Sequence, residues 1–225
     1  MAKKKVTKED QNLENVQDAL NTTSAWIEKN QNKLTWAITV IALVVTGVLA
    51  LNTYVIKPKA VEVSNENAKA VNYFMQGDWE KALNGDDAEC VGFQAIADEY
   101  KLFQGGKLAA LYAGVCYYQL GQYEDAAAYL AKFKASDLTI EPAALQLLGD
   151  AYVQLEEYGK AAKAFEAAAK SGNDLVAPMS LKKVGFVYLE MGNKAAAKKA
   201  FETIKANYPA STEAQDIEKY IELAK

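Results

Sequence analysis

Three segments of this chain share one pattern: GVCYYQLGQYEDAAAYLAKF at residues 114–133, GDAYVQLEEYGKAAKAFEAA at 149–168 and GFVYLEMGNKAAAKKAFETI at 185–204. Each opens on a glycine, and Gly114, Gly149 and Gly185 are 35 and 36 residues apart. A tyrosine recurs three positions after the glycine, an alanine twelve positions after it, and a leucine or phenylalanine sixteen positions after it. Self-similarity at a period of roughly 34 residues is typical of stacked helical hairpins, so the pattern predicts an all-α solenoid.

The small residues of the pattern have a physical role. Gly114 and Ala126 fall on two consecutive predicted helices, with a turn around Gly121 between them. We expect the two helices to approach closely at these small side chains. The larger side chains expected to fill the space on either side are Tyr117, Leu130 and Phe133. One such hairpin cannot bury its apolar face alone, so neighbouring hairpins must stack. The alternative is an ordinary alanine-rich bundle whose segments are similar by accident.

The pattern resembles the tetratricopeptide (TPR) repeat, which has a small residue, a tyrosine, an alanine, an aromatic residue and a closing proline. The last segment matches it most fully, through Gly185, Tyr188, Gly192, Ala197, Phe201 and Pro209. The tryptophan usual near the start of the pattern is replaced by Ala110, Leu145 and Leu181. The resemblance implies a TPR-type α-solenoid with three regular repeats at residues 107–210.

Both ends of this region depart from the regular repeat. Residues 64–106 are predicted to form an irregular TPR-like hairpin, because Ala82 and Phe93 are eleven residues apart where Ala197 and Phe201 are four apart. Seven extra residues, at 84–90, therefore interrupt it. Residues 211–225 are predicted to form a C-terminal capping helix, which a solenoid needs to cover its last apolar face. The side chains expected to pack back onto the repeats are Ile217, Tyr220, Ile221 and Leu223.

An uncharged run at residues 34–56 predicts a transmembrane helix. Its 23 residues would form a helix of about 34 Å, enough to cross a hydrocarbon core of about 30 Å. Trp36 and Tyr54 lie near its ends, where amphipathic rings favour the headgroup level. A signal peptide cleaved after Ala50 is the alternative, but the long preceding segment argues against it. Because Pro58 follows the run, we expect a linker at residues 57–63 and a new helix near Ser64.

Residues 1–33 are predicted to form a basic tail and an amphipathic helix. Leu13, Val16, Leu20 and Ile27 give that helix one apolar stripe. It could lie on the membrane surface, dock a partner or remain disordered, and the sequence leaves these alternatives open. The lysines before the run slightly outnumber those close behind it. The positive-inside rule then places the N-terminus in the cytoplasm and the TPR domain in the periplasm, as a single-pass protein of a bacterial inner membrane.

Composition excludes several kinds of chemistry. The chain has no histidine, and its 25 basic residues, all lysine, stand against 29 acidic residues. Without histidine there is no imidazole base, no Ser-His-Asp arrangement and no histidine metal ligand. An acidic chain without arginine also suits nucleic acid poorly. We therefore expect no enzyme activity, no catalytic residue, no cofactor, no metal, no small-molecule substrate and no nucleic-acid partner.

Two thiols and two pairs of adjacent acids remain as candidates for chemistry. Cys90 and Cys116 are expected to be buried and free, although they could pair if the domain lies outside the cytoplasm. The pairs at 86–87 and 156–157 consist of neighbours in sequence, which do not face each other on a helix. They are therefore expected to be solvated.

In TPR domains the first helices of the hairpins line a concave groove. Carried onto this chain, the resemblance predicts twelve partner-binding positions, here called the groove face: Phe74, Leu108, Leu111, Val115, Tyr118, Gln119, Gln146, Asp150, Gln154, Lys182, Phe186 and Glu190. Some TPR domains bind a C-terminal carboxylate through a basic and amide clamp. Because Leu111 and Val115 occupy clamp positions here, we do not expect that activity.

The layout of the chain is also similar to the YfgM-type proteins of the bacterial inner membrane, which are ancillary partners of the Sec translocon with chaperone-like behaviour. This resemblance implies a membrane-anchored TPR interaction scaffold. Its partner would be a membrane or periplasmic protein, such as the translocon or exported chains. The alternative is an assembly subunit of a cell-envelope complex that makes its main contacts through the transmembrane and N-terminal helices.

Overall fold

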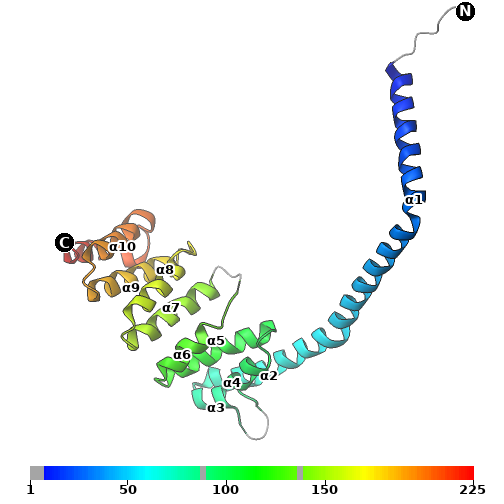
Figure 1. Cartoon of the computed structure of the whole chain (residues 1–225). Helices are drawn as coiled ribbons and strands as arrows, with labels where there is room; N and C mark the ends of the chain where they lie inside the picture. The colour runs from blue at the N-terminus through cyan, green and yellow to red at the C-terminus, as the bar shows by residue number, and fades with distance from the viewer. Residues whose placement is uncertain (1–7, 87–89, 136–138) are drawn as a thin grey trace, which may run out of the picture. The chain divides into compact units, whose positions relative to one another are not determined.

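The computed structural model of the protein describes residues 8–86, 90–135 and 139–225, with side chains at residue 17 and from residue 21 onward. Within these ranges the regular elements are all helices (Figure 1), which confirms the predicted all-α solenoid class. The chain divides into two compact units, residues 1–58 and 59–225, each taken by itself below. The expected basic tail at residues 1–6 lies outside the described range.

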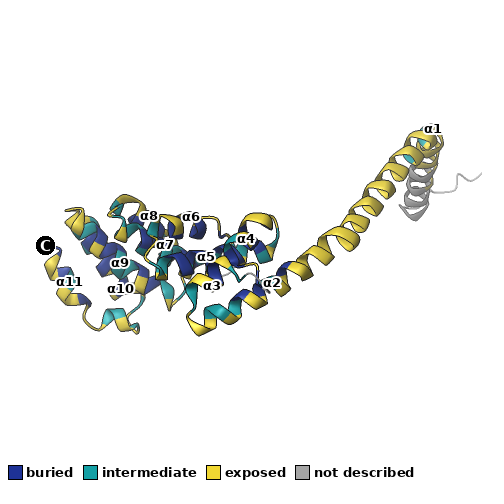
Figure 2. Ribbon diagram, turned by 90° about the horizontal axis from the view of Figure 1, so that it is seen from below, coloured by how far each residue is buried: buried dark blue, intermediate teal, exposed yellow. Residues whose placement is uncertain are grey.

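The first unit is helical throughout its described part. Helix α1 (Lys8–Leu51) contains both the expected amphipathic segment and most of the apolar run, and the π-helical turn η1 (Asn52–Ile56) follows it. The hydroxyls of Thr35, Thr39 and Thr46 donate to carbonyl oxygens four residues earlier, so these polar groups are satisfied inside the helix. Among the described residues, one helix is long and apolar enough to cross a membrane. Figure 2 shows its apolar residues as exposed.

The expected linker at residues 57–63 is wrong, because helix α2 (Lys57–Gln76) begins seven residues before Ser64. Pro58 is the second residue of α2, and because η1 runs directly into α2, this proline removes a backbone donor inside a helical stretch. In the π-helical turn before it, the Lys57 N–H donates to the Asn52 carbonyl, five residues earlier. A turn with an inserted residue is one way in which a helix adjusts where a proline disturbs its hydrogen bonding.

Three regular hairpins form most of the second unit. They are α5 (Gln104–Gln119) with α6 (Tyr123–Leu130), α7 (Ile140–Gln154) with α8 (Tyr158–Ala169), and α9 (Val176–Glu190) with α10 (Lys194–Asn207). Each first helix packs against its own second helix, and α7 also contacts the first helices on both sides, α5 and α9. Pro142 and Pro178 are each the third residue of a first helix, where the missing N–H costs no hydrogen bond.

The repeat glycines admit the large side chain sixteen positions later. A Cβ on Gly185 would lie 2.3 Å from Cε1 of Phe201, and one on Gly149 would lie 2.5 Å from Cε1 of Phe165. On Gly114 the Cβ would lie 2.6 Å from Cγ of Leu130. The helices therefore approach closely at the glycine, but the residue that faces it is the leucine or phenylalanine and not the expected alanine, Ala126 in the first repeat.

The turn between α7 and α8 holds a residue in a backbone conformation that favours glycine. Glu156 has φ 56°, where the other two repeats place Gly121 at φ 75° and Gly192 at φ 72°. We predict that Glu156→Gly raises the free energy of unfolding by about 0.5–1 kcal/mol, because glycine relieves the left-handed conformation. Chemical denaturation followed by circular dichroism measures the change. Glu157→Gly is the matched control, since φ there is −83°, and an equal gain in both variants would contradict the explanation.

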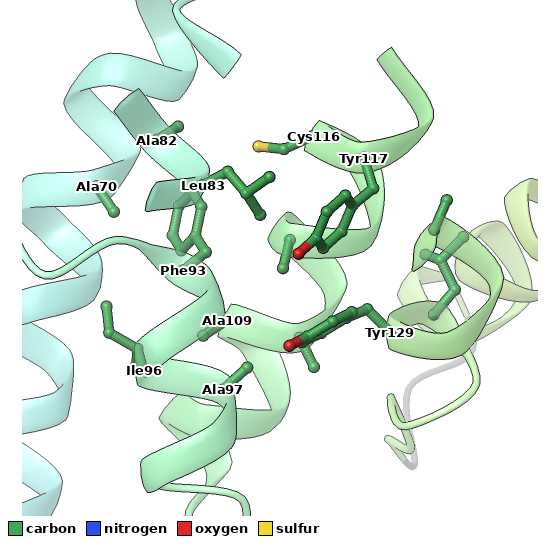
Figure 3. Close-up of a cluster of buried hydrophobic side chains, with 14 of the residues drawn as sticks. Ala70, Ala82, Leu83, Phe93, Ile96, Ala97, Ala109, Cys116, Tyr117 and Tyr129 are labelled. Atoms are coloured by element: carbon green, nitrogen blue, oxygen red, sulfur yellow. The ribbon is translucent and has the colours of Figure 1, made fainter. Parts of the chain in front are cut away.

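The irregular hairpin has an interrupted second helix. Helix α3 (Trp79–Asn84) and helix α4 (Phe93–Glu99) occupy the place of one helix in a regular repeat. Of the predicted insertion at 84–90, residues 87–89 lie outside the described range. Phe93 and Ile96 of α4 are fully buried, and Figure 3 shows them beside Ala70 and Leu83. This hairpin therefore shares the hydrophobic core of the first regular repeat.

The C-terminal cap follows the prediction in part. It consists of the 3-10 turn η2 (Thr212–Ala214) and helix α11 (Ile217–Leu223). Ile217 and Ile221 are buried against Phe201, as expected. The expectation for Leu223 is wrong, because this side chain is 58% exposed and Ala224 is buried in its place.

A tyrosine–carboxylate–lysine contact joins α4 to α6. The Tyr129 hydroxyl donates to Asp98 Oδ2 at 2.6 Å, and Lys132 Nζ lies 3.1 Å from Asp98 Oδ1. The hydrogen bond from Tyr129, helped by Lys132, holds the pKa of Asp98 below its usual range. The charged carboxylate therefore contributes stability above the unfolded-state pKa of about 3.9, and this contribution is lost as the pH falls through the lower folded-state pKa.

We accordingly predict a pH-dependent cost for Asp98→Asn. At pH 7 the substitution should lower the free energy of unfolding by about 1 kcal/mol or less, since Asp98 and Lys132 are both about half exposed. Below about pH 4 the difference should shrink progressively, because protons then bind the wild-type carboxyl, first in the unfolded state and, as the pH falls through the lower folded-state pKa, in the folded state. Denaturant titrations of both proteins between pH 2.5 and 7 measure it, and a pH-independent difference would argue against an ionic origin.

Candidate protein-binding face

The predicted groove face lies on the first helices of the hairpins. Phe74 is on α2, five positions are on α5, three on α7 and three on α9. All twelve side chains are half-buried or exposed, and none is fully buried. Because α7 contacts both α5 and α9, the positions on these three helices form neighbouring rows.

An apolar hollow, here called the α5–α7 hollow, lies within these rows. Its volume is about 320 Å³, and its lining has almost no polar surface. The lining residues are Leu111, Tyr112, Val115, Thr139, Ile140, Ala143, Ala144 and Leu147. Leu111 and Val115 are predicted groove positions, whereas the other six are not. The hollow can take up apolar side chains, and it has no charge with which to bind a polar ligand.

The one lysine of the groove face, Lys182, and its neighbour Lys183 are each paired with a carboxylate of the protein. Lys182 Nζ lies 2.8 Å from Asp216, whose carboxylate comes from the C-terminal cap. The next residue, Lys183, lies 2.6 Å from Asp150. Asp150 is one of the predicted groove positions, whereas its partner Lys183 is not. Burial, and then the charge of Asp150, raise the pKa of the Tyr118 hydroxyl.

Two aromatic side chains of the groove face, Phe74 and Phe186, pack against other rings of the protein. Phe74 makes edge contacts with Trp79 and Tyr112, at ring-centroid distances of 5.1 and 5.0 Å. Phe186 meets the ring of Tyr220 in α11 at 4.9 Å. These two rings stabilise the ends of the row, and a partner could reach only part of each.

The remaining polar positions of the groove face differ in whether their side chains are hydrogen-bonded or exposed to solvent. Gln146 Nε2 donates to Ser180 Oγ at 3.2 Å, which ties α7 to α9. Gln119, Gln154 and Glu190 are exposed. A partner that crosses the row would therefore meet two accessible amides and one carboxylate.

The polar contacts between neighbouring repeats share nearly the same separation in sequence. Lys132 and Asp98, Gln146 and Ser180, and Lys182 and Asp216 are each 34 residues apart, and Asp150 and Lys183 are 33 apart. Side chains one repeat apart therefore lie together on neighbouring hairpins. Applied to the sequence, this spacing would have paired Asp150 with Lys183 and Lys182 with Asp216.

The thiols are not placed for reaction. Cys90 and Cys116 are both buried, and neither forms a disulfide. Burial raises the pKa of the Cys116 thiol to about 12, so it stays protonated at neutral pH. In the part of the chain that the structure describes, no group of three or more Cys, Asp or Glu side chains could hold a metal ion.

Comparison with known families agrees with the geometry of the hairpins. Models of the tetratricopeptide repeat match residues 108–137, 142–171 and 183–211. The chain carries tetratricopeptide repeats. The matched segments coincide with the three regular hairpins, and such repeats indicate a protein–protein interaction scaffold.

Two solved structures are similar to this chain. One crystal structure of MamA protein aligns with a TM-score of 0.53 and 21% identity, over 72% of this chain and 89% of MamA. A second, also of MamA, aligns with a TM-score of 0.48 and 22% identity, over 69% of this chain and 91% of the other. At this identity the first similarity supports the TPR fold alone. No curated protein matches the chain.

Proposed function

We propose that this protein is a membrane-anchored interaction scaffold that binds another polypeptide on its groove face. The TPR repeats carry this proposal, because their first helices carry both an apolar hollow and accessible amides. The apolar run at residues 34–56 supports the anchor by its length and composition. The partner would be a membrane or periplasmic protein, such as one at the Sec translocon, or an exported chain that the protein holds in a chaperone-like way.

The proposed arrangement has the N-terminus in the cytoplasm and the repeats in the periplasm of a bacterial inner membrane. The lysines before the run support this orientation. Protease treatment of spheroplasts tests it directly. The repeats should be digested while an N-terminal epitope stays protected, and the reverse pattern would place the groove face in the cytoplasm.

Affinity purification from solubilised membranes tests the binding function. The full chain should co-purify a partner, and Gln119→Glu combined with Gln154→Glu should reduce its recovery because both exposed amides become charged. Lys163→Gln combined with Lys199→Gln, at exposed residues of the second helices, is the control, because it lowers the net charge by the same two units. Equal recovery in the groove and control variants would contradict binding at this face.

The alternative proposal is an assembly subunit of a cell-envelope complex. The long helix α1 supports it, because many of its large apolar side chains are exposed. A fragment of residues 1–60 separates the two proposals. If this fragment recovers the same partner as the full chain, the assembly subunit is the better account; if it loses the partner, the scaffold is.

A further inference from the structure

We propose that the α5–α7 hollow binds an uncharged apolar stretch of an extended polypeptide that is flanked by lysine or arginine, and that it rejects carboxylate-bearing segments. This inference rests on the proposed function, because it names the class of partner that the groove face takes. It concerns which chain segment is recognised, at a site whose eight lining residues are described.

The size of the hollow selects individual side chains. Its volume of about 320 Å³ is near the lower end of the roughly 300–1,000 Å³ typical of small-molecule sites. A folded module cannot enter such a space, whereas one or two aliphatic side chains of an extended segment can. Ala143 and Ile140 at its edge are exposed, so the entering segment would reach the lining from solvent.

The lining selects apolar groups. None of the eight lining residues carries a charge. The side-chain hydroxyl of Thr139 already accepts a hydrogen bond from Asn173 Nδ2 at 3.3 Å. A carboxylate or ammonium group placed here would lose its hydration without gaining a partner, which is costly. Aliphatic side chains lose only unfavourable contact with water.

The charges of α9 and of the whole repeat unit disfavour acidic segments. Lys182 and Lys183 are each paired with a carboxylate of the protein itself, so neither is available to a ligand carboxylate. Glu190 of the groove face is exposed. Residues 59–225 contain 18 lysines and 24 acids, which leaves the repeat unit net negative. Complementarity therefore favours positive flanks on the bound segment.

Two synthetic peptides test the inference on the full chain in nanodiscs of zwitterionic lipid. Both have blocked ends and the same leucine–alanine run with one photoreactive leucine; lysines flank the run in one and aspartates in the other. We expect the lysine-flanked peptide to crosslink to residues of the hollow and to bind at least about tenfold more tightly than the aspartate-flanked one. Empty nanodiscs measure the lipid background.

Variants of Ala143 make the test specific to the hollow. Ala143→Leu should fill it and weaken binding by about tenfold or more, the value of burying one aliphatic side chain. Ala167→Leu is the matched control, since Ala167 is an equally exposed alanine on α8. Ala143→Lys is a second variant that adds a charge and should shift the preference toward the aspartate-flanked peptide.

Three results would overturn the inference: equal binding of the two peptides, no effect of Ala143→Leu, or no crosslink to the lining with either peptide. These failures are distinguishable from failure of the proposed function. If the peptides fail while exposed groove positions still crosslink to a partner in native membranes, the scaffold stands and the apolar-segment inference is wrong. If both fail, both proposals are wrong.

Discussion

Replacing Gly185 with alanine should lower the free energy of unfolding of the repeat unit by about 1–3 kcal/mol, the usual cost of overpacking a core. The new Cβ would lie 2.3 Å from Cε1 and 2.6 Å from Cζ of Phe201. The Phe201 ring is fully buried and lies against Phe186 and Tyr220, so it cannot move aside freely. Helices α9 and α10 must therefore separate. Chemical denaturation monitored by far-ultraviolet circular dichroism measures the loss.

Gly159 gives a matched control within the same fold. No atom lies within 4 Å of the position its Cβ would take, and it is the second residue of α8. Gly159→Ala should therefore leave stability unchanged or raise it by up to about 1 kcal/mol, since alanine is the better helix former. Phe201→Leu should partly rescue Gly185→Ala, so that the double variant loses less than the sum of the single changes. Additive losses would contradict the contact.

Placing two lysines in the middle of the apolar run should release the protein from the membrane. Val44→Lys with Val45→Lys introduces two charges, each of which costs about 2.5–3.5 kcal/mol at the centre of a spanning helix. The apolar side chains of α1 and η1 favour insertion of the wild-type segment, and the hydroxyls of Thr35, Thr39 and Thr46 are bonded within the helix. We expect most of the variant to move from the membrane pellet to the soluble fraction after alkaline extraction and flotation.

Val44→Leu with Val45→Leu is the control for this prediction, because it changes the same positions and keeps them apolar. It should stay fully in the membrane fraction. If the lysine variant stays there as well, residues 34–56 do not anchor the protein. An N-terminal epitope that remains on the membrane-bound full-length chain would separately exclude cleavage after Ala50.

The hairpins could be predicted from the sequence because their defining contacts recur at fixed offsets. A glycine facing a leucine or phenylalanine sixteen residues later appears three times, so the register is fixed before any tertiary information. The interrupted hairpin could be found by comparison with that register. The continuous helix through Pro58 could not, since the outcome depends on a π-helical turn that no residue pattern specifies.

The candidate site was less predictable. The groove-face residues Leu111 and Val115 line the hollow, but Ile140, Ala143 and Leu147 are apolar residues in an apolar helix, and only stacking distinguishes them. Adjacent residues on a helix point about 100° apart. A difference of one residue therefore decides that Lys183, and not Lys182, contacts Asp150. Partners 33 or 34 residues apart were visible in the sequence, but the spacing became informative only once the hairpins were stacked.

The central claim is that a partner binds the groove face of a membrane-anchored protein, and site-specific photocrosslinking in native membranes tests it most directly. The photoreactive residue would replace Gln119 or Gln154 on the groove face, and Lys163 on α8 as the control; all three side chains are exposed. We predict a discrete crosslinked partner from both groove positions and none from position 163. Equal crosslinking from all three positions, or crosslinks from position 163 alone, would contradict the account.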